Sequence, residues 1–258
     1  MPASTTVTGM VLSAMPVGDY DKRLVILTKE LGKISAFAKG ARKPNSALLA
    51  CSGPFSFGEF TLFAGRSSYN IISADISNYF PELRQDYEAL CYGIYFCEFA
   101  DFITKENNDE KDILKLLYQT LRALTKKTIN AALIKVIFEL KMIALNGQAP
   151  QVFQCVKCDR DTQGQVSSGE ISHLSGYYFS AECGGILCEA CKGYDQSAIH
   201  VDTSTLYTMQ YIISKEIEKL YTFIVTDKVQ YELDRCMKRC LDRYIDHVFK
   251  ALEMLKTL

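Results

Sequence analysis

Four cysteines in two Cys-x-x-Cys pairs carry the strongest chemical signal in this sequence. The pairs are Cys155/Cys158 and Cys188/Cys191, separated by 29 residues. Two such pairs supply a tetrahedron of thiolates, which selects zinc over magnesium or calcium. Four protein ligands leave no open coordination position, so we expect one structural zinc per chain. The gap exceeds the ~15–20 residues usual for such sites, and a hairpin over 166–179 could fill it.

Other interpretations of these cysteines stay open. They could be two buried pairs of free thiols, or include a redox Cys-x-x-Cys, although the segment lacks a strand–helix context. Cys183 could replace Cys188 as a ligand. We favour Cys188, because Gly193 follows its pair and allows the knuckle to turn. We interpret His173 and His200 as surface residues, since four cysteines already complete the site.

The remaining cysteines are interpreted as ordinary small hydrophobic residues. They occur singly or at helical spacing, and the paired ones on apolar stripes belong to the core. Ten cysteines in a chain of 258 residues with no expected secretory signal indicate reduced thiols in a cytosol. The cysteines interpreted as small hydrophobic residues are Cys51, Cys91, Cys97, Cys236 and Cys240.

A second candidate site is a group of cations near the start of the chain. The net charge is −1, yet residues 19–43 contain seven Lys/Arg and three Asp/Glu. Cations that follow phosphates and rings that stack on bases together bind single strands. The alternative is a solvated surface over a barrel core, because rings at alternating strand positions usually point inward. The aromatic residues concerned are Phe37, Phe55, Phe57, Phe60, Phe63 and Tyr69.

A turn should present three of these cations to a phosphate backbone. Gly40 and Pro44 frame Lys39, Arg42 and Lys43, which keeps the three side chains free of the barrel core. We expect these three residues to form the main contact with a nucleic-acid backbone, which is DNA if the family resemblance described below holds. The neighbouring turn adds a second set, Lys22 and Arg23.

The surrounding pattern predicts an α+β protein with two domains. Residues 1–80 show five short strands, which suggest a small closed barrel or a sandwich, and an OB-fold has that strand count. Residues 81–258 follow the helical period, interrupted by a turn-rich, cysteine-rich insertion at about 151–200. The expected strands are Thr5–Met15, Arg23–Thr28, Ile34–Lys39, Phe55–Ala64 and Tyr69–Ile76. The expected helices are Tyr87–Ile103, Ile113–Leu124, Ile129–Ile143 and Val229–Val248.

Several classes of protein are disfavoured. The sequence has no G-x-x-x-x-G-K-[ST] loop, no G-x-S-x-G and no His followed two residues later by Glu. With three histidines there is little from which to build a general-base site, so we expect no enzyme. Apolar runs are too short to span a membrane.

The whole chain resembles the RecO family of bacterial recombination mediators. No single motif is as diagnostic as a P-loop, but the order of the segments along the full length is specific. The segments carrying the resemblance are Thr6–Leu12, Asp19–Thr28, Leu31–Lys33, Ala38–Lys43, Phe63–Tyr69, Tyr79–Tyr87, Phe179–Ser180, Gly184–Gly185 and the paired cysteines.

The resemblance implies an N-terminal OB-fold, a helical domain and an inserted zinc element. It implies binding of single- and double-stranded DNA, annealing of complementary strands, and work with RecR. Together these would help RecA to load onto strands coated by single-stranded DNA-binding protein, without nucleotide hydrolysis, in the cytoplasm at the nucleoid. It also implies contact with the acidic, hydrophobic tail of that coating protein. We therefore expect an apolar groove with a basic rim in the helical domain, formed by Lys105, Lys111, Lys126 and Lys127 or by Lys/Arg of 215–243.

Two rival functions remain at this point. One is an RNA-binding OB-fold protein in translation or RNA processing, which a comparison of DNA with RNA would separate. The other is a protein-only scaffold with a structural zinc, favoured if Asp19, Asp21 and Glu30 neutralise the cations.

Overall fold

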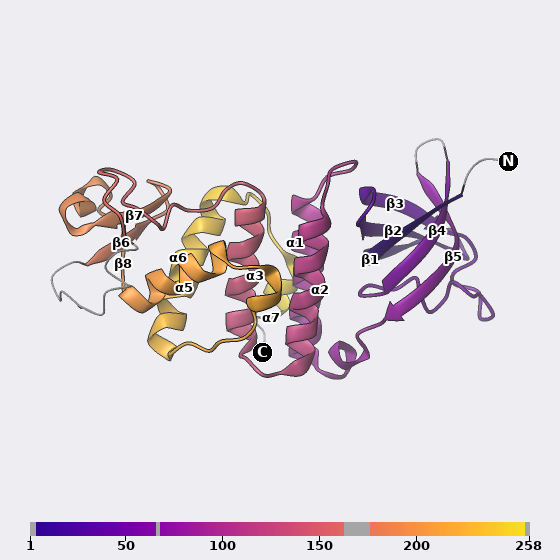
Figure 1. Ribbon diagram of the computed structural model, residues 1–258. Coiled ribbons are helices and arrows are strands. Elements are labelled where there is room, and N and C mark those ends of the chain that lie inside the picture. The colour runs from indigo at the N-terminus through magenta and orange to yellow at the C-terminus, as the bar shows by residue number, and fades with distance from the viewer. Residues whose placement is uncertain (1–3, 66–67, 163–175, 256–258) are drawn as a thin grey trace. The chain divides into compact units, whose positions relative to one another are not determined.

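The computed structural model describes residues 4–65, 68–162 and 176–255 (Figure 1). The chain divides into two compact units: one comprises Met1–Thr128 with Phe249–Leu258, and the other is Ile129–Val248. Most of the hairpin expected over 166–179, and His173 with it, lie outside the described residues.

The first unit begins with a closed five-stranded barrel. Its strand order is β1-β2-β3-β5-β4, with β3 and β5 parallel and the other neighbours antiparallel. The expected barrel is therefore confirmed over the sandwich (Figure 1). The strands are β1 (Ser4–Val17), β2 (Asp21–Thr28), β3 (Gly32–Ala38), β4 (Phe57–Ala64) and β5 (Tyr69–Asn78).

Alternation of side chains along the strands fills the barrel. Leu24 and Ile26 on β2, and Phe60 and Leu62 on β4, are fully buried and belong to one apolar core. Strand β1 runs longer than expected because its first part pairs with β4 and its second part with β2, with a register shift between Val11 and Ser13. Closure brings backbones close together, and a Cβ on Gly58 would lie 2.1 Å from the Asp75 carbonyl oxygen.

Helices α1 (Tyr87–Ile103), α2 (Lys111–Lys126) and α7 (Lys250–Leu255) complete the first unit, after the short 3-10 helix η1 (Pro81–Gln85). Asp86 caps α1, and its side chain accepts a hydrogen bond from the N–H of Ala89. Helix α1 packs against β1, α2 and α7. The Phe249 ring stacks on Phe99 with centroids 5.0 Å apart, which places the last helix in this unit.

Among its described residues, the second unit contains the longer helices α3 (Ala131–Leu145), α5 (Thr203–Ser214) and α6 (Asp227–Tyr244), with the short 3-10 helix η3 (Ile217–Lys219). Helix α6 ends at Tyr244, earlier than the expected Val248. Lys141 on α3 is buried, and its ammonium donates to the carbonyls of Ile213 and Lys215 at the end of α5. This cation satisfies backbone groups that helix termini leave without partners.

A small sheet lies within the same unit. Its order is β7-β6-β8, formed by β6 (Tyr177–Ser180), β7 (Gly185–Cys188) and β8 (Ile199–Val201), all antiparallel. The 3-10 helix η2 (Glu189–Tyr194) follows β7 directly. The insertion expected at about 151–200 therefore contains regular structure as well as turns.

Candidate metal centre and nucleic-acid interface

The four paired cysteines converge on one point. Their Sγ atoms all lie within 4.8 Å of one another, and those of Cys158 and Cys188 are 3.7 Å apart. A tetrahedron with Zn–S bonds of ~2.3 Å has S–S edges of about 3.8 Å. Three of the four cysteines are buried and Cys158 is exposed. The donor set and its spacing fit a tetrahedral thiolate-bound metal such as zinc.

Local backbone turns aim the sulfurs of the first pair. The N–H of Asp159 donates to the Cys155 carbonyl at 2.9 Å, and Asp159 has a positive φ of 55°. The N–H of Val156 donates to the Ile186 carbonyl, which joins this turn to β7.

The second pair of cysteines has a different backbone conformation from the first. Cys188 ends β7 and Cys191 lies in η2. Gly193 is absent from the residues with positive φ, and a Cβ there would meet nothing within 4 Å. A short 3-10 helix therefore makes the turn, and the conformational freedom of this glycine is not what forms it.

Backbone donors prepare Cys155 for deprotonation. Burial alone would raise the pKa of its thiol, but N–H groups of Cys188, Lys157 and Cys158 outweigh it and lower that pKa to about 6. The pKa of Cys191 is raised to about 12 by its burial and by the other three thiols. Thiols crowded in this way do not all ionise without a cation among them.

The other sulfur and imidazole groups lie outside this convergence. Cys183 packs against the buried cluster of Cys155, Leu187, Cys188 and Cys191, but it is not one of the four cysteines whose Sγ atoms meet. The His200 ring makes an edge contact with Tyr178, with centroids 5.3 Å apart, and is exposed. Cys51, Cys91, Cys97, Cys236 and Cys240 are all buried.

A buried side-chain amide joins the cysteine-rich segment to the helices of the second unit. Gln210 of α5 donates to the Val152 carbonyl at 2.8 Å and to the Thr162 hydroxyl at 3.0 Å. Sequence reasoning missed Gln210, because a glutamine inside a helical segment carries no signal of burial until its distant partners are known.

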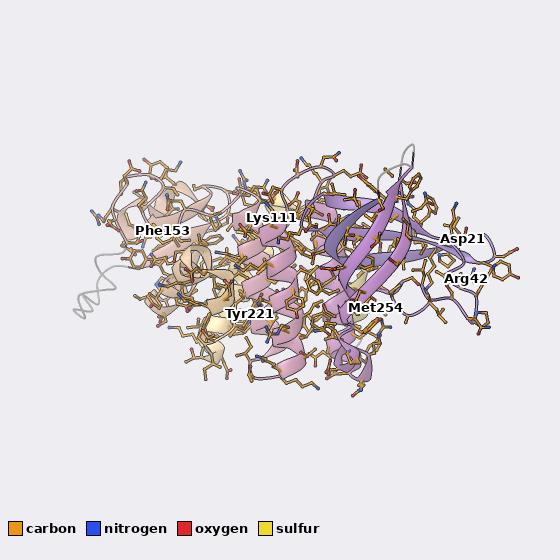
Figure 2. All side chains as sticks on the ribbon, turned by 45° about the vertical axis from the view of Figure 1, so that its right-hand side comes forward. Asp21, Arg42, Lys111, Phe153, Tyr221 and Met254 are labelled. Carbon is orange, nitrogen blue, oxygen red and sulfur yellow. The ribbon has the colours of Figure 1, made fainter. Side chains whose placement is uncertain are left out.

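One end of the barrel presents the expected cations. Lys39, Arg42 and Lys43 are exposed, and no ion pair within the described residues involves any of them. The Asp21 carboxylate accepts from the N–H of Gly40 at 2.7 Å, which holds the turn (Figure 2). Glu30 likewise accepts from a backbone N–H, that of Thr8.

The second set of cations divides in two. The Lys22 ammonium donates to the carbonyl and the hydroxyl of Ser52, at 3.1 and 3.0 Å, and is partly buried. Arg23 is exposed, and its Nε donates to the Ser35 hydroxyl at 2.8 Å. Lys22 is thus engaged in holding the 39–56 loop, whereas most of the Arg23 guanidinium stays available.

Two of the six aromatic residues considered as stacking candidates are buried, and the other four are half-buried. Phe55 and Phe60 are buried, and the Phe57 ring packs on Tyr118 with centroids 4.5 Å apart. Phe37 is half-buried and lies opposite Arg23 across the β2–β3 pair. Sequence reasoning missed Tyr20, which is 55% exposed at the end of the barrel that carries the cations.

Comparison with known proteins identifies the chain. Residues 1–80 match the family model "Recombination protein O N terminal", and residues 84–253 match "Recombination protein O C terminal". This chain belongs to the RecO family. Its resemblance to RecO proteins at the level of sequence segments is thereby confirmed.

Several curated RecO proteins align over nearly the full length. The DNA repair protein RecO of Alkaliphilus metalliredigens is 34% identical, covering 97% of this chain and 98% of the relative. That of Acetivibrio thermocellus is 30% identical, covering 97% and 95%. The RecO protein of Symbiobacterium thermophilum is 28% identical, covering 98% and 96%.

The second unit of this RecO-family chain also contains an apolar groove of about 640 Å³. Helix α5, the 222–226 segment and the start of α6 line it, with Tyr207, Tyr211, Phe223 and Ile224 among the lining side chains. Ile224 is 78% exposed. The Lys215 ammonium lies 5.7 Å from the centre of the Tyr211 ring, which places a cation at the rim.

The other candidate rim lysines, Lys105, Lys111, Lys126 and Lys127, belong to the first unit. In the part of the RecO chain that the structure describes, no helix is long and apolar enough to cross a membrane.

Proposed function

We propose that this RecO-family protein acts in DNA repair and recombination by holding single strands at the cationic end of its barrel. The observation that carries the proposal is the exposed group Lys39, Arg42 and Lys43, which form no ion pair within the described residues. Cations that no carboxylate of the protein neutralises can neutralise phosphates and release counterions, which is the main source of non-specific affinity. OB-fold barrels bind oligonucleotides with their β2–β3 face and adjoining loops, where Arg23 and Phe37 lie here.

The finer function is that of a mediator without catalysis. The protein binds single- and double-stranded DNA and anneals complementary strands. With RecR it helps RecA to load onto strands coated by single-stranded DNA-binding protein, in the cytoplasm. Family membership supports this role, and the names of the relatives place them in DNA repair. The groove at Tyr211 and Ile224 offers a surface for the acidic, hydrophobic tail of the coating protein.

Zinc is the proposed occupant of the cysteine site, held by Cys155, Cys158, Cys188 and Cys191. Bound there, it would supply a structural cross-link between the 155–158 turn and the β7–η2 segment. Four thiolates leave no position for substrate, so the metal takes no part in chemistry. The protein contributes the backbone N–H groups that stabilise the Cys155 thiolate.

Titration of a labelled DNA single strand at several salt concentrations tests the DNA-binding function. Affinity should fall linearly on a log–log plot against salt, with a slope of about −0.7 for each phosphate contact. Adding the complementary strand should then give duplex faster than the strands form it alone. An RNA strand of equal sequence is the matched control.

Absence of salt-dependent binding would overturn the proposal in favour of a protein-only scaffold. Tighter binding of RNA than of DNA would instead indicate readout of the 2′-hydroxyl and an RNA-binding role.

A further inference from the structure

The hairpin tip between β1 and β2 carries an exposed aromatic ring beside the cationic turn. Tyr20 is 55% exposed, and the Lys43 ammonium lies 5.3 Å from the centre of its ring. Met15 and Val17, on the same hairpin, are 55% and 39% exposed. Single exposed hydrophobic residues are common, but here three of them lie on one hairpin whose end meets the cations.

Hydrogen bonds to and from the backbone fix this tip to the neighbouring turn. The N–H of Arg42 donates to the Tyr20 carbonyl at 2.9 Å, and its guanidinium donates to the Gly18 carbonyl at 3.1 Å. The adjacent Asp21 accepts from the N–H of Gly40. Figure 2 shows Asp21 and Arg42 together at this end of the barrel. The Tyr20 backbone is therefore held in place before any ligand arrives, which lowers the entropy lost on binding.

We infer that Tyr20 is a stacking platform for an unpaired nucleobase, with Lys43 and Arg42 holding the phosphates on either side of that base. The inference rests on the proposed function, and it adds the residue that favours a single strand over a duplex. A flat ring stacks on any exposed base face, whereas bases inside a duplex are already stacked on one another. Lys43 lies near both the Tyr20 ring and the expected path of the DNA backbone, so one ammonium can contact the phosphate next to the stacked base.

The chain contains no tryptophan, which allows a direct optical test. Tyr20→Trp places a single indole at the tip, and stacking of a base on it should quench its fluorescence as oligo-dT is added. The matched control is Tyr231→Trp. Tyr231 is also exposed, at 63%, and has its own cation, with Arg235 5.6 Å from the ring centre, but it lies on α6 of the other unit.

A second pair of variants measures the contribution to affinity. Tyr20→Ala should weaken binding of an oligo-dT strand by about 5- to 150-fold, the usual loss for one stacked base, and should leave the salt slope unchanged. Tyr20→Phe keeps the ring and should bind within about twofold of the unsubstituted protein. Binding of a blunt duplex should change by less than about twofold in both. Thermal unfolding of each variant confirms that the barrel is intact.

The outcomes separate this inference from the proposed function. Salt-dependent binding of oligo-dT by Tyr20→Trp without quenching, or unweakened binding by Tyr20→Ala, overturns the stacking role and leaves the phosphate contacts standing. Equal losses for single strand and duplex overturn it as well. Failure of the unsubstituted protein to bind oligo-dT at low salt overturns both proposals.

Discussion

The backbone N–H of Cys188 donates a hydrogen bond to the Sγ of Cys155 across 3.4 Å. This bond joins two segments more than thirty residues apart. It points the Cys155 sulfur at Cys188, the first residue of the second pair. A hydrogen bond to a thiolate stabilises its charged form, so the backbone of the second pair helps the Cys155 thiol of the first pair to ionise. The two pairs therefore form one site, and losing either should release the metal.

Metal analysis of cysteine variants tests that site. Purified under reductant, the protein should contain about one zinc per chain, because four thiolates complete one tetrahedral site. Cys155→Ser and Cys191→Ser should lose the metal and unfold at lower temperature, since binding energy of a structural metal is also folding energy. Cys183→Ser is the control and should retain it. Zinc retained by Cys188→Ser and lost from Cys183→Ser would reverse the ligand assignment.

The cationic turn should control the salt dependence of DNA binding. Replacing Lys39, Arg42 and Lys43 together by Ala removes three phosphate partners, so the slope of log affinity against log salt should flatten by about 2. Binding should weaken about equally for all sequences, and annealing should fall with it. Zinc content and melting temperature should stay near those of the unsubstituted protein, because exposed charges contribute little to folding.

Lys22→Ala is a useful contrast with that triple variant. The Lys22 ammonium holds Ser52, so its removal should destabilise the protein by about 1–2 kcal/mol and change the salt slope less than the triple variant does. Thermal denaturation and salt titration of the two proteins side by side provide the measurement. A triple variant with unchanged DNA binding would place the DNA site elsewhere on the protein.

The apolar groove of the second unit should bind the acidic tail of single-stranded DNA-binding protein. Ile224→Asp puts a negative charge among its apolar side chains, and should weaken binding of a labelled tail peptide by about tenfold or more. Ile224 is 78% exposed, so the change removes little buried area and the variant should stay folded. Ile72→Asp, at a 56% exposed position on β5, is the matched control. Equal peptide binding by both variants would argue against this groove.

Asp86 should stabilise the first unit through its cap on α1. Its carboxylate accepts from the N–H of Ala89 at 3.1 Å and pairs with Lys127 at 2.5 Å. Asp86→Ala should cost about 1 kcal/mol of unfolding free energy, the usual cost of an N-cap. Lys127→Ala should cost less, because its side chain is 66% exposed and water screens the pair. Urea denaturation of the two variants separates cap from ion pair.

The pH dependence of this contribution has a definite sign. The hydrogen bond from Lys127 and the backbone N–H of Ala89 lower the pKa of Asp86 below its ordinary value. A carboxyl with a lowered folded-state pKa stabilises the protein above its unfolded pKa of ~3.9, and that stability is lost as pH falls through the folded value. The difference in unfolding free energy between the unsubstituted protein and Asp86→Ala should therefore become smaller below about pH 4.

Patterns within short stretches of sequence were sufficient for much of this structure. The spacing of Cys155, Cys158, Cys188 and Cys191 indicated one metal site because each pair is nearly fixed by its own turn. Alternating apolar residues predicted five strands because side chains point to opposite faces at every second residue. Gly40 marked the turn that exposes the cations, and its φ of 67° explains why a glycine stands there.

Which residues share a surface follows from how distant segments pack against one another. The sequence does not distinguish Lys22 from Lys43. In the structure the Lys22 ammonium donates to the Ser52 hydroxyl, whereas the Lys43 ammonium lies over the Tyr20 ring. The break after Tyr244 and the return of Phe249 to Phe99 were equally hidden, because the apolar period continues through the break. Local sequence determines the conformation of each segment, since it acts through neighbouring dihedrals and side-chain alternation. Which side chains then meet depends on loop closures over tens of residues, and no local pattern records those partners.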